Sequence, residues 1–135
     1  MPFLLDTGIL YALADEDDDW HERARDFIWK NRLPLVSPVS VLPEVTYLLR
    51  SRLGPDAERT FVESVAAGEI TAENLTAGDL TRCAALLREF GFLGFVDASV
   101  VAVAERLRLR SIVTTDRRDF QRVRPRHTSA FELLP

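Results

Sequence analysis

The stretch FVDASVVAVAERLRLRSIVTTDRRDF, residues 95–120, determines most of what the sequence predicts about the fold. Its first half carries one apolar stripe at helical spacing: Val96, Val100, Val103, Ala104 and Leu107. The segment 111–114 is short, apolar and β-branched, which is typical of a buried strand. Asp97 therefore begins a helix, and Asp116 follows the carboxyl end of a strand. That edge of an open α/β sheet is where ligands bind.

Short apolar strands alternate with helices along the rest of the chain. Strands are predicted at 2–6, 33–36, 69–75, 111–114 and 128–131. Helices are predicted at 7–13, 20–30, 40–52, 57–67, 77–90 and 96–107, with a short turn at 118–122. Ser37 and Pro38 are expected to end the second strand, and Ser40 to cap the helix after it. This alternation predicts a three-layer α/β/α sandwich around a central parallel sheet, as one domain spanning residues 1–135.

Composition indicates an ordinary soluble globular protein. The 135 residues include 47% apolar and 28% charged residues. No apolar run is long enough to span a membrane and no signal peptide is recognisable, so a cytoplasmic location is expected. Cys83 is the only cysteine, which excludes a disulfide framework and favours a small core residue.

The charge distribution is uneven although the net charge is only −4. This net charge argues against a protein that coats nucleic acid non-specifically. Residues 106–126 nevertheless contain eight arginines, most of which are interpreted as a solvated basic surface. Arg117 and Arg118 are the exceptions, because they adjoin Asp116 and arginine binds phosphate through two parallel hydrogen bonds. Both are therefore predicted to contact substrate phosphate.

Four carboxylates are expected on one rim of the parallel sheet: Asp6 and Asp116 after strands, Asp97 at a helix start, and Glu44 in a helix that follows a strand. Like charges 4 Å apart repel by about 4 kcal/mol at an effective dielectric of about 20, so the cluster requires a cation or protonated carboxyls. Oxygen ligands without His or Cys favour hard ions, Mg²⁺ or Mn²⁺. Thr7 and Thr114 add hydroxyls that can orient the carboxylates. Such a site supports hydrolysis of a phosphodiester by an ion-activated water.

The four segments that carry these acids closely resemble, in this order, the PIN-domain family, specifically the VapC-type toxin ribonucleases: LLDTGILYAL, SVLPEVTYLL, FVDASVVAVAERLRL and SIVTTDRRDF. The resemblance extends from Phe3 to about Arg124. It implies a metal-dependent endoribonuclease, a homodimer, and a partner antitoxin that occludes the site. Matched to the family's motifs, the acidic metal-binding quartet is Asp6, Glu44, Asp97 and Asp116, and its hydroxyl residues are Thr7 and Thr114. Asp119 matches a frequent additional acid with a supporting or capping role.

Two features depart from the family pattern: Gly8, where many relatives carry a bulkier or polar residue, and the hydrophobic loop 91–95, which can alter the substrate entrance. A non-catalytic PIN-like module for RNA binding or scaffolding is the alternative. Degenerate members would be expected to lose acids from the quartet, and all four are present. Aspartyl-phosphate enzymes are disfavoured, because a dehalogenase-type site needs an acid at position 8 and a receiver needs a lysine late in the sheet. Lys30 is the only lysine.

Overall fold

A computed structural model describes residues 2–32 and 34–135 and shows a five-stranded, all-parallel sheet. In chain order the strands are β1 (Phe3–Leu5), β2 (Leu35–Pro38), β3 (Thr71–Glu73), β4 (Ser111–Val113) and β5 (Glu132–Leu134). Across the sheet they follow the order β3-β2-β1-β4-β5. Leu4 of β1 pairs with Val36 on one side and Ile112 on the other. The predicted central parallel sheet is therefore confirmed.

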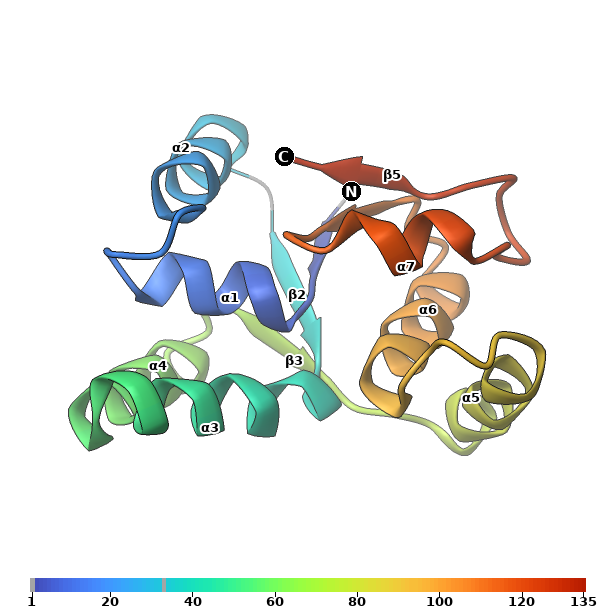
Figure 1. Cartoon of the computed structure of the whole chain (residues 1–135), viewed down its shortest axis with the longest axis horizontal. Helices are drawn as coiled ribbons and strands as arrows, with labels where there is room; N and C mark the ends of the chain where they lie inside the picture. Colours follow the sequence, from blue (N-terminus) through green and yellow to red (C-terminus); the bar gives the residue numbers. More distant parts are fainter. Residues whose placement is uncertain (1, 33) are drawn as a thin grey trace.

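Helices cover both faces of this sheet. They are α1 (Thr7–Ala14), α2 (His21–Asn31), α3 (Leu42–Leu53), α4 (Pro55–Ala66), α5 (Ala77–Glu89), α6 (Phe95–Leu107) and α7 (Arg117–Arg122), with a 3₁₀ turn at Val39–Val41. Figure 1 shows α1 to α4 on one side of the strands and α5 and α6 on the other, which is the predicted α/β/α arrangement. In the part of the chain that the structure describes, no helix is long and apolar enough to cross a bilayer.

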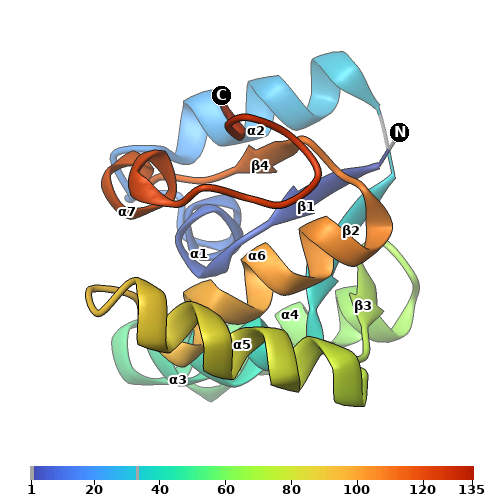
Figure 2. The same ribbon diagram turned by 90° about the vertical axis from the view of Figure 1, so that its right-hand side faces the viewer.

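The core lies where α6 packs against the central strands. Every residue of α6 from Ala98 to Ala104 is buried, and the central strand residues Leu4 and Ile112 are completely inaccessible to solvent. Alanine, serine and valine dominate this part of α6, so the helix can lie close to the sheet. Figure 2 shows α6 running beneath β1 and β2, with α5 packed along its outer side. Cys83 of α5 is buried and free, as predicted.

The order of the strands creates a switch point between β1 and β4. From β1 the chain proceeds to β2 and β3 in one direction across the sheet, then crosses back to β4 and β5 on the other side of β1. The connections after β1 and β4 therefore diverge to opposite faces. In open α/β sheets this divergence leaves a crevice at the carboxyl ends of the two strands. Asp6 and Asp116 follow these two strands.

Three sequence expectations about local structure were wrong. The last strand is Glu132–Leu134 and not 128–131, because the chain must first return from α7 to the starting edge of β4. His127 contacts the carbonyl of Leu109 on this return path, and Glu132 then pairs with Ser111. As a parallel neighbour of β4, the last strand begins beside Ser111, the first residue of β4. Leu33, the expected start of the second strand, lies outside the described residues.

The other two corrections concern the end of β2. Ser37 and Pro38 belong to this strand, because its pairing with β1 has already ended at Val36 and the missing N–H of Pro38 is tolerated on that side. Ser40 does not cap α3 and contacts the hydroxyl of Ser99 in α6 instead.

Candidate active site

Asp6 and Asp116 occupy the switch point from two adjacent strands. Asp6 caps α1, and its side chain accepts a hydrogen bond from the backbone N–H of Ile9 at 3.2 Å. Asp116 is the residue before α7. The hydroxyl of Thr114 connects the two, because it donates to the Asp6 carboxylate and accepts from the backbone N–H of Asp116 at 2.9 Å. The structure therefore places Thr114 where it orients both acidic segments.

Glu44 and Asp97 come to the same rim from two helix starts. Glu44 lies in the first turn of α3 and Asp97 in the first turn of α6. The Ser40–Ser99 hydroxyl contact ties the chain just before α3 to the first turns of α6. Thr7 donates a hydrogen bond to Glu44 at 2.6 Å, so its hydroxyl serves Glu44 and not Asp6. The Ser40–Ser99 pair was missed by sequence reasoning, because nothing in the chain links residues 59 positions apart.

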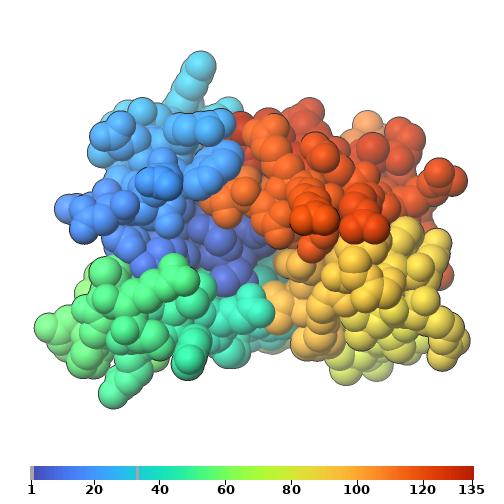
Figure 3. Space-filling view, in the orientation of Figure 1, coloured from blue at the N-terminus to red at the C-terminus, as the bar shows by residue number. Residues whose placement is uncertain are grey.

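The starts of α1, α3, α6 and α7 meet on the face shown in Figure 1. The space-filling view of this face shows the dark blue atoms of α1 recessed between the green and cyan atoms of α3 and the orange atoms of α7 (Figure 3). The four predicted carboxylates thus belong to elements that converge on one hollow of the surface.

Asp6 is held in an environment that opposes its ionisation. It is 5% exposed, and this burial raises the pKa of its carboxyl from 3.8 to about 7. The hydrogen bonds from Thr114 and Ile9 act in the opposite direction but are outweighed. The negative charges of Asp97 and Asp116 raise the pKa further. Asp6 therefore titrates near neutrality in the metal-free protein.

The pKa of the Asp97 carboxyl is also raised. Burial raises the pKa of its carboxyl to about 6, and the charges of Asp116, Asp119 and Glu44 add to the effect. Among the described residues, no ion pair links any of the four predicted acids to a basic side chain. The site thus concentrates negative charge without a protein cation to neutralise it, and a bound cation would relieve this repulsion.

Asp79 shows what a structural acid looks like in this protein. It is 3% exposed, and burial by itself raises the pKa of its carboxyl. Hydrogen bonds from Arg106 and from the backbone of Thr76 outweigh burial, so the pKa lies below its ordinary value. Thr76 and Asp79 also form the capping box of α5. Asp6 and Asp97 lack any arginine partner of this kind.

The carboxylates share a rim but do not form a finished coordination sphere. Within residues 2–32 and 34–135, no three His, Cys, Asp or Glu side chains are grouped so that they could hold an ion as they stand. The expectation of four carboxylates within a few ångströms of each other is therefore not met. Mutual repulsion keeps unneutralised carboxylates apart, and Thr7 holds Glu44. The donor set itself, all carboxylate and hydroxyl oxygen, fits a hard divalent ion.

The arginines near the site differ in their exposure and in their hydrogen bonds. Arg117 is partly buried and donates a hydrogen bond to the backbone oxygen of Pro135, whereas Arg118 is exposed. Asp119 lies in the first turn of α7, close enough to raise the pKa of Asp97. Most arginines of residues 106–126 were expected to form a solvated basic surface. Arg106 departs from this expectation, because it forms ion pairs with Asp79 and Glu73.

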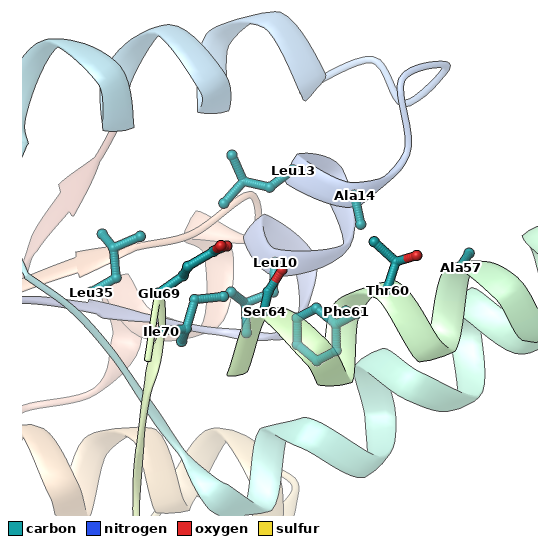
Figure 4. Close-up of a pocket in the computed structure, with 10 residues that line it drawn as sticks. All are labelled: Leu10, Leu13, Ala14, Leu35, Ala57, Thr60, Phe61, Ser64, Glu69 and Ile70. Atoms are coloured by element: carbon teal, nitrogen blue, oxygen red, sulfur yellow. The ribbon is translucent and has the colours of Figure 1, made fainter. Parts of the chain in front are cut away.

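An apolar cavity lies away from the predicted site acids. Its volume is 470 Å³, and its lining residues come from α1, α4 and the edges of β2 and β3: Leu10, Leu13, Ala14, Leu35, Ala57, Thr60, Phe61, Ser64, Glu69 and Ile70. Figure 4 shows Glu69, Thr60 and Ser64 as the polar side chains among them. None of the predicted site acids lines this cavity.

The doubly wound parallel sheet with carboxylates at its switch point is accompanied by a match to a known family. The chain belongs to the PIN-domain family, whose model matches residues 3–125. It is similar to Ribonuclease VapC26 of Mycobacterium tuberculosis, with 31% identity over 134 residues, 98% of this chain and 99% of that protein. The family resemblance of the four sequence motifs is thereby confirmed.

Two solved structures have the same fold. One is VapC20 of Mycobacterium tuberculosis, a sarcin–ricin loop cleaving toxin, with a TM-score of 0.77, 24% identity, and coverage of 86% of this chain and 91% of that chain. The other is VapBC2 from Rickettsia felis, bound to a fragment of its promoter DNA, with a TM-score of 0.71, 17% identity, and coverage of 98% and 97%. At these identities both structures establish the fold.

Proposed function

We propose that this chain is a metal-dependent endoribonuclease of the VapC type, the toxin of a toxin–antitoxin pair. The observation that carries the proposal is the convergence of Asp6, Glu44, Asp97 and Asp116 on one rim without basic partners. The similarity to Ribonuclease VapC26 over nearly the whole of both chains supports the same activity. We also propose a cytoplasmic location, because the proposed substrate is cellular RNA.

The acids would hold Mg²⁺ or Mn²⁺, which supplies a water nucleophile and neutralises charge on the reacting phosphate. The chain's own residues prepare the site for this ion. Thr114 fixes the Asp6 carboxylate, Thr7 fixes Glu44, and Asp97 is partly buried. The free cysteine is buried, and burial raises the pKa of its thiol, so Cys83 does not supply a nucleophile.

Metal removal tests the proposal directly. Excess EDTA should abolish cleavage of RNA, and added Mg²⁺ or Mn²⁺ should restore it, because the acids alone cannot activate water or neutralise phosphate. The measurement is RNA cleavage followed on a gel, with titration calorimetry of Mn²⁺ as a second readout. Full activity in EDTA would disprove metal-dependent hydrolysis. Failure to bind any divalent ion would instead favour a non-catalytic RNA-binding or scaffolding module.

Replacing Arg117 and Arg118 together by Ala should weaken RNA binding and lower the dependence of log Kd on log salt by about one to two counterions. Arg118 should contribute more than Arg117, because one guanidinium nitrogen of Arg117 is engaged by Pro135. Binding is measured by fluorescence anisotropy at several salt concentrations. Arg59→Ala in α4 is the matched control, since that arginine pairs with Asp56 and Glu63. An unchanged salt slope in the double variant would identify both arginines as ordinary surface charges.

The proposal extends to partners. Solved structures with this fold include a toxin–antitoxin complex from Klebsiella pneumoniae, at 22% identity and a TM-score of 0.68 over 87% of this chain and 89% of that chain. We propose that a cognate antitoxin occludes the carboxylate rim and that the chain forms a homodimer. Co-expression with the neighbouring gene product, followed by light scattering of the free and bound protein, tests both points.

A further inference from the structure

The hydroxyl of Thr115 occupies the space in which a side chain at Gly8 would begin. A Cβ at position 8 would overlap the hydroxyl oxygen of Thr115, and it would lie 3.6 Å from the Thr115 Cβ and 3.9 Å from Asp6 Oδ1. The backbone of Gly8 does not have a positive φ. A side chain at position 8 would have to displace the Thr115 hydroxyl, so glycine is favoured here by space and not by backbone conformation. The missing side chain leaves room for the Thr115 hydroxyl beside Asp6.

This hydroxyl differs from the one that precedes it in the chain. Thr114 is buried, and its hydroxyl is committed to the Asp6 carboxylate and the backbone N–H of Asp116. Thr115 is partly exposed, and among the described residues its hydroxyl has no hydrogen-bond partner. Both oxygens of Asp6 already accept hydrogen bonds, from Ile9 and from Thr114. A hydroxyl without a partner among the described residues, on a partly exposed residue, thus lies directly before Asp116 in the chain.

We propose that Thr115 donates a hydrogen bond to a non-bridging oxygen of the RNA phosphate that is cleaved, and that the missing side chain of Gly8 leaves the space that this hydroxyl occupies. The assignment rests on the proposed ribonuclease function. The neighbouring side chains, Asp6 and Asp116, are acidic and repel a phosphate, whereas a neutral hydroxyl can contact it directly.

The expected effect follows from the loss of one hydrogen bond to a charged oxygen. Thr115→Ala should lower kcat/KM for RNA cleavage by about tenfold to hundredfold. Thr115→Ser retains the hydroxyl and should stay within about threefold of wild type. Thr81→Ala, at an exposed threonine of α5, is the matched control and should not change activity.

A double-mutant cycle separates this role from simple packing. Gly8→Ala adds the overlapping Cβ and displaces the Thr115 hydroxyl, so it should lower kcat/KM about as much as Thr115→Ala does. The double variant Gly8→Ala/Thr115→Ala should be no less active than either single variant, because the same hydroxyl is lost only once. The melting temperature should be higher in the double variant than in Gly8→Ala, because the overlapping oxygen is gone. From Gly8→Ala to the double variant, the melting temperature should therefore rise while kcat/KM stays low.

Binding measurements assign the contact to substrate or to metal. In an Asp97→Asn background, Thr115→Ala should raise the Kd for uncleaved RNA, measured by anisotropy. In the otherwise wild-type protein it should leave the Kd for Mn²⁺, measured by calorimetry, unchanged. Wild-type activity in Thr115→Ala, or independent losses that multiply in the double variant, would overturn the assignment. Weaker Mn²⁺ binding with unchanged RNA binding would also overturn it. A wild-type protein that cleaves no RNA would overturn the proposed function itself.

Discussion

Asp97→Asn should reduce RNA cleavage by about 10³-fold or more while the circular dichroism spectrum stays that of wild type. Asparagine has nearly the shape of aspartate but cannot supply the negative charge that holds a divalent ion. Asp97 makes no hydrogen bond within the described chain that the substitution would break, so the fold should persist. Asp6→Asn should have the same effect on cleavage, and its amide oxygen can still accept from Ile9 to cap α1.

The controls for this prediction are a matched acid and a second readout. Asp56→Asn removes an exposed carboxylate of α4 and should leave cleavage unchanged. Calorimetry should show weaker Mn²⁺ binding in both site variants and not in the control. If Asp97→Asn cleaved RNA at the wild-type rate with unchanged metal binding, Asp97 would not belong to the site.

Asp97→Asn should also stabilise the metal-free protein. Burial, together with the charges of Asp116, Asp119 and Glu44, raises the pKa of Asp97 from 3.8 to about 6. In the unfolded chain the same carboxyl ionises near 3.8, so the folded state binds more protons between about pH 4 and pH 6. Stability therefore falls as the pH rises through this window, and the loss is complete above it. Asparagine carries no charge and avoids this loss.

At pH 7.5 in EDTA we expect Asp97→Asn to be more stable than wild type by on the order of 1 to 2 kcal/mol, after allowance for solvent screening, which is about 3 to 8 °C in melting temperature. The difference should shrink as the pH is lowered toward 4. Asp116→Asn should give a smaller increase, because Asp116 is exposed. Mg²⁺ should stabilise wild type by mass action and Asp97→Asn less. Each of these differences is measured by calorimetric or dye-based melting of each protein, with EDTA and with Mg²⁺.

Asp79→Asn is the opposite control. Asp79 is buried, pairs with Arg106 and completes the capping box of α5, so its neutralisation should lower the melting temperature. A lower melting temperature for Asp97→Asn in EDTA would place Asp97 in the same structural class as Asp79. The predicted metal site would then be wrong at that position.

The sequence by itself determined the elements that carry the acids. The helical stripe through 96–107 and the apolar segment 111–114 placed Asp97 and Asp116, and both elements are present at nearly these bounds. The capping box of Thr76 and Asp79 at the start of α5 likewise forms between residues three positions apart. These features are local, since they depend on residues within one or two turns of each other. Such patterns are legible without knowing what packs against them.

Only the tertiary structure decided which side chains meet. Thr7 binds Glu44 and Thr114 binds Asp6 across 37 and 108 positions of the chain, and Arg106 proved to be a partner of Asp79. The start of β5 depended on how far the chain must travel back from α7 before it can pair in parallel. The raised pKa of Asp6 comes mainly from burial, and the role of Gly8 comes from the hydroxyl opposite it. Contact, burial and free space depend on distance in three dimensions, and a linear sequence does not state those distances.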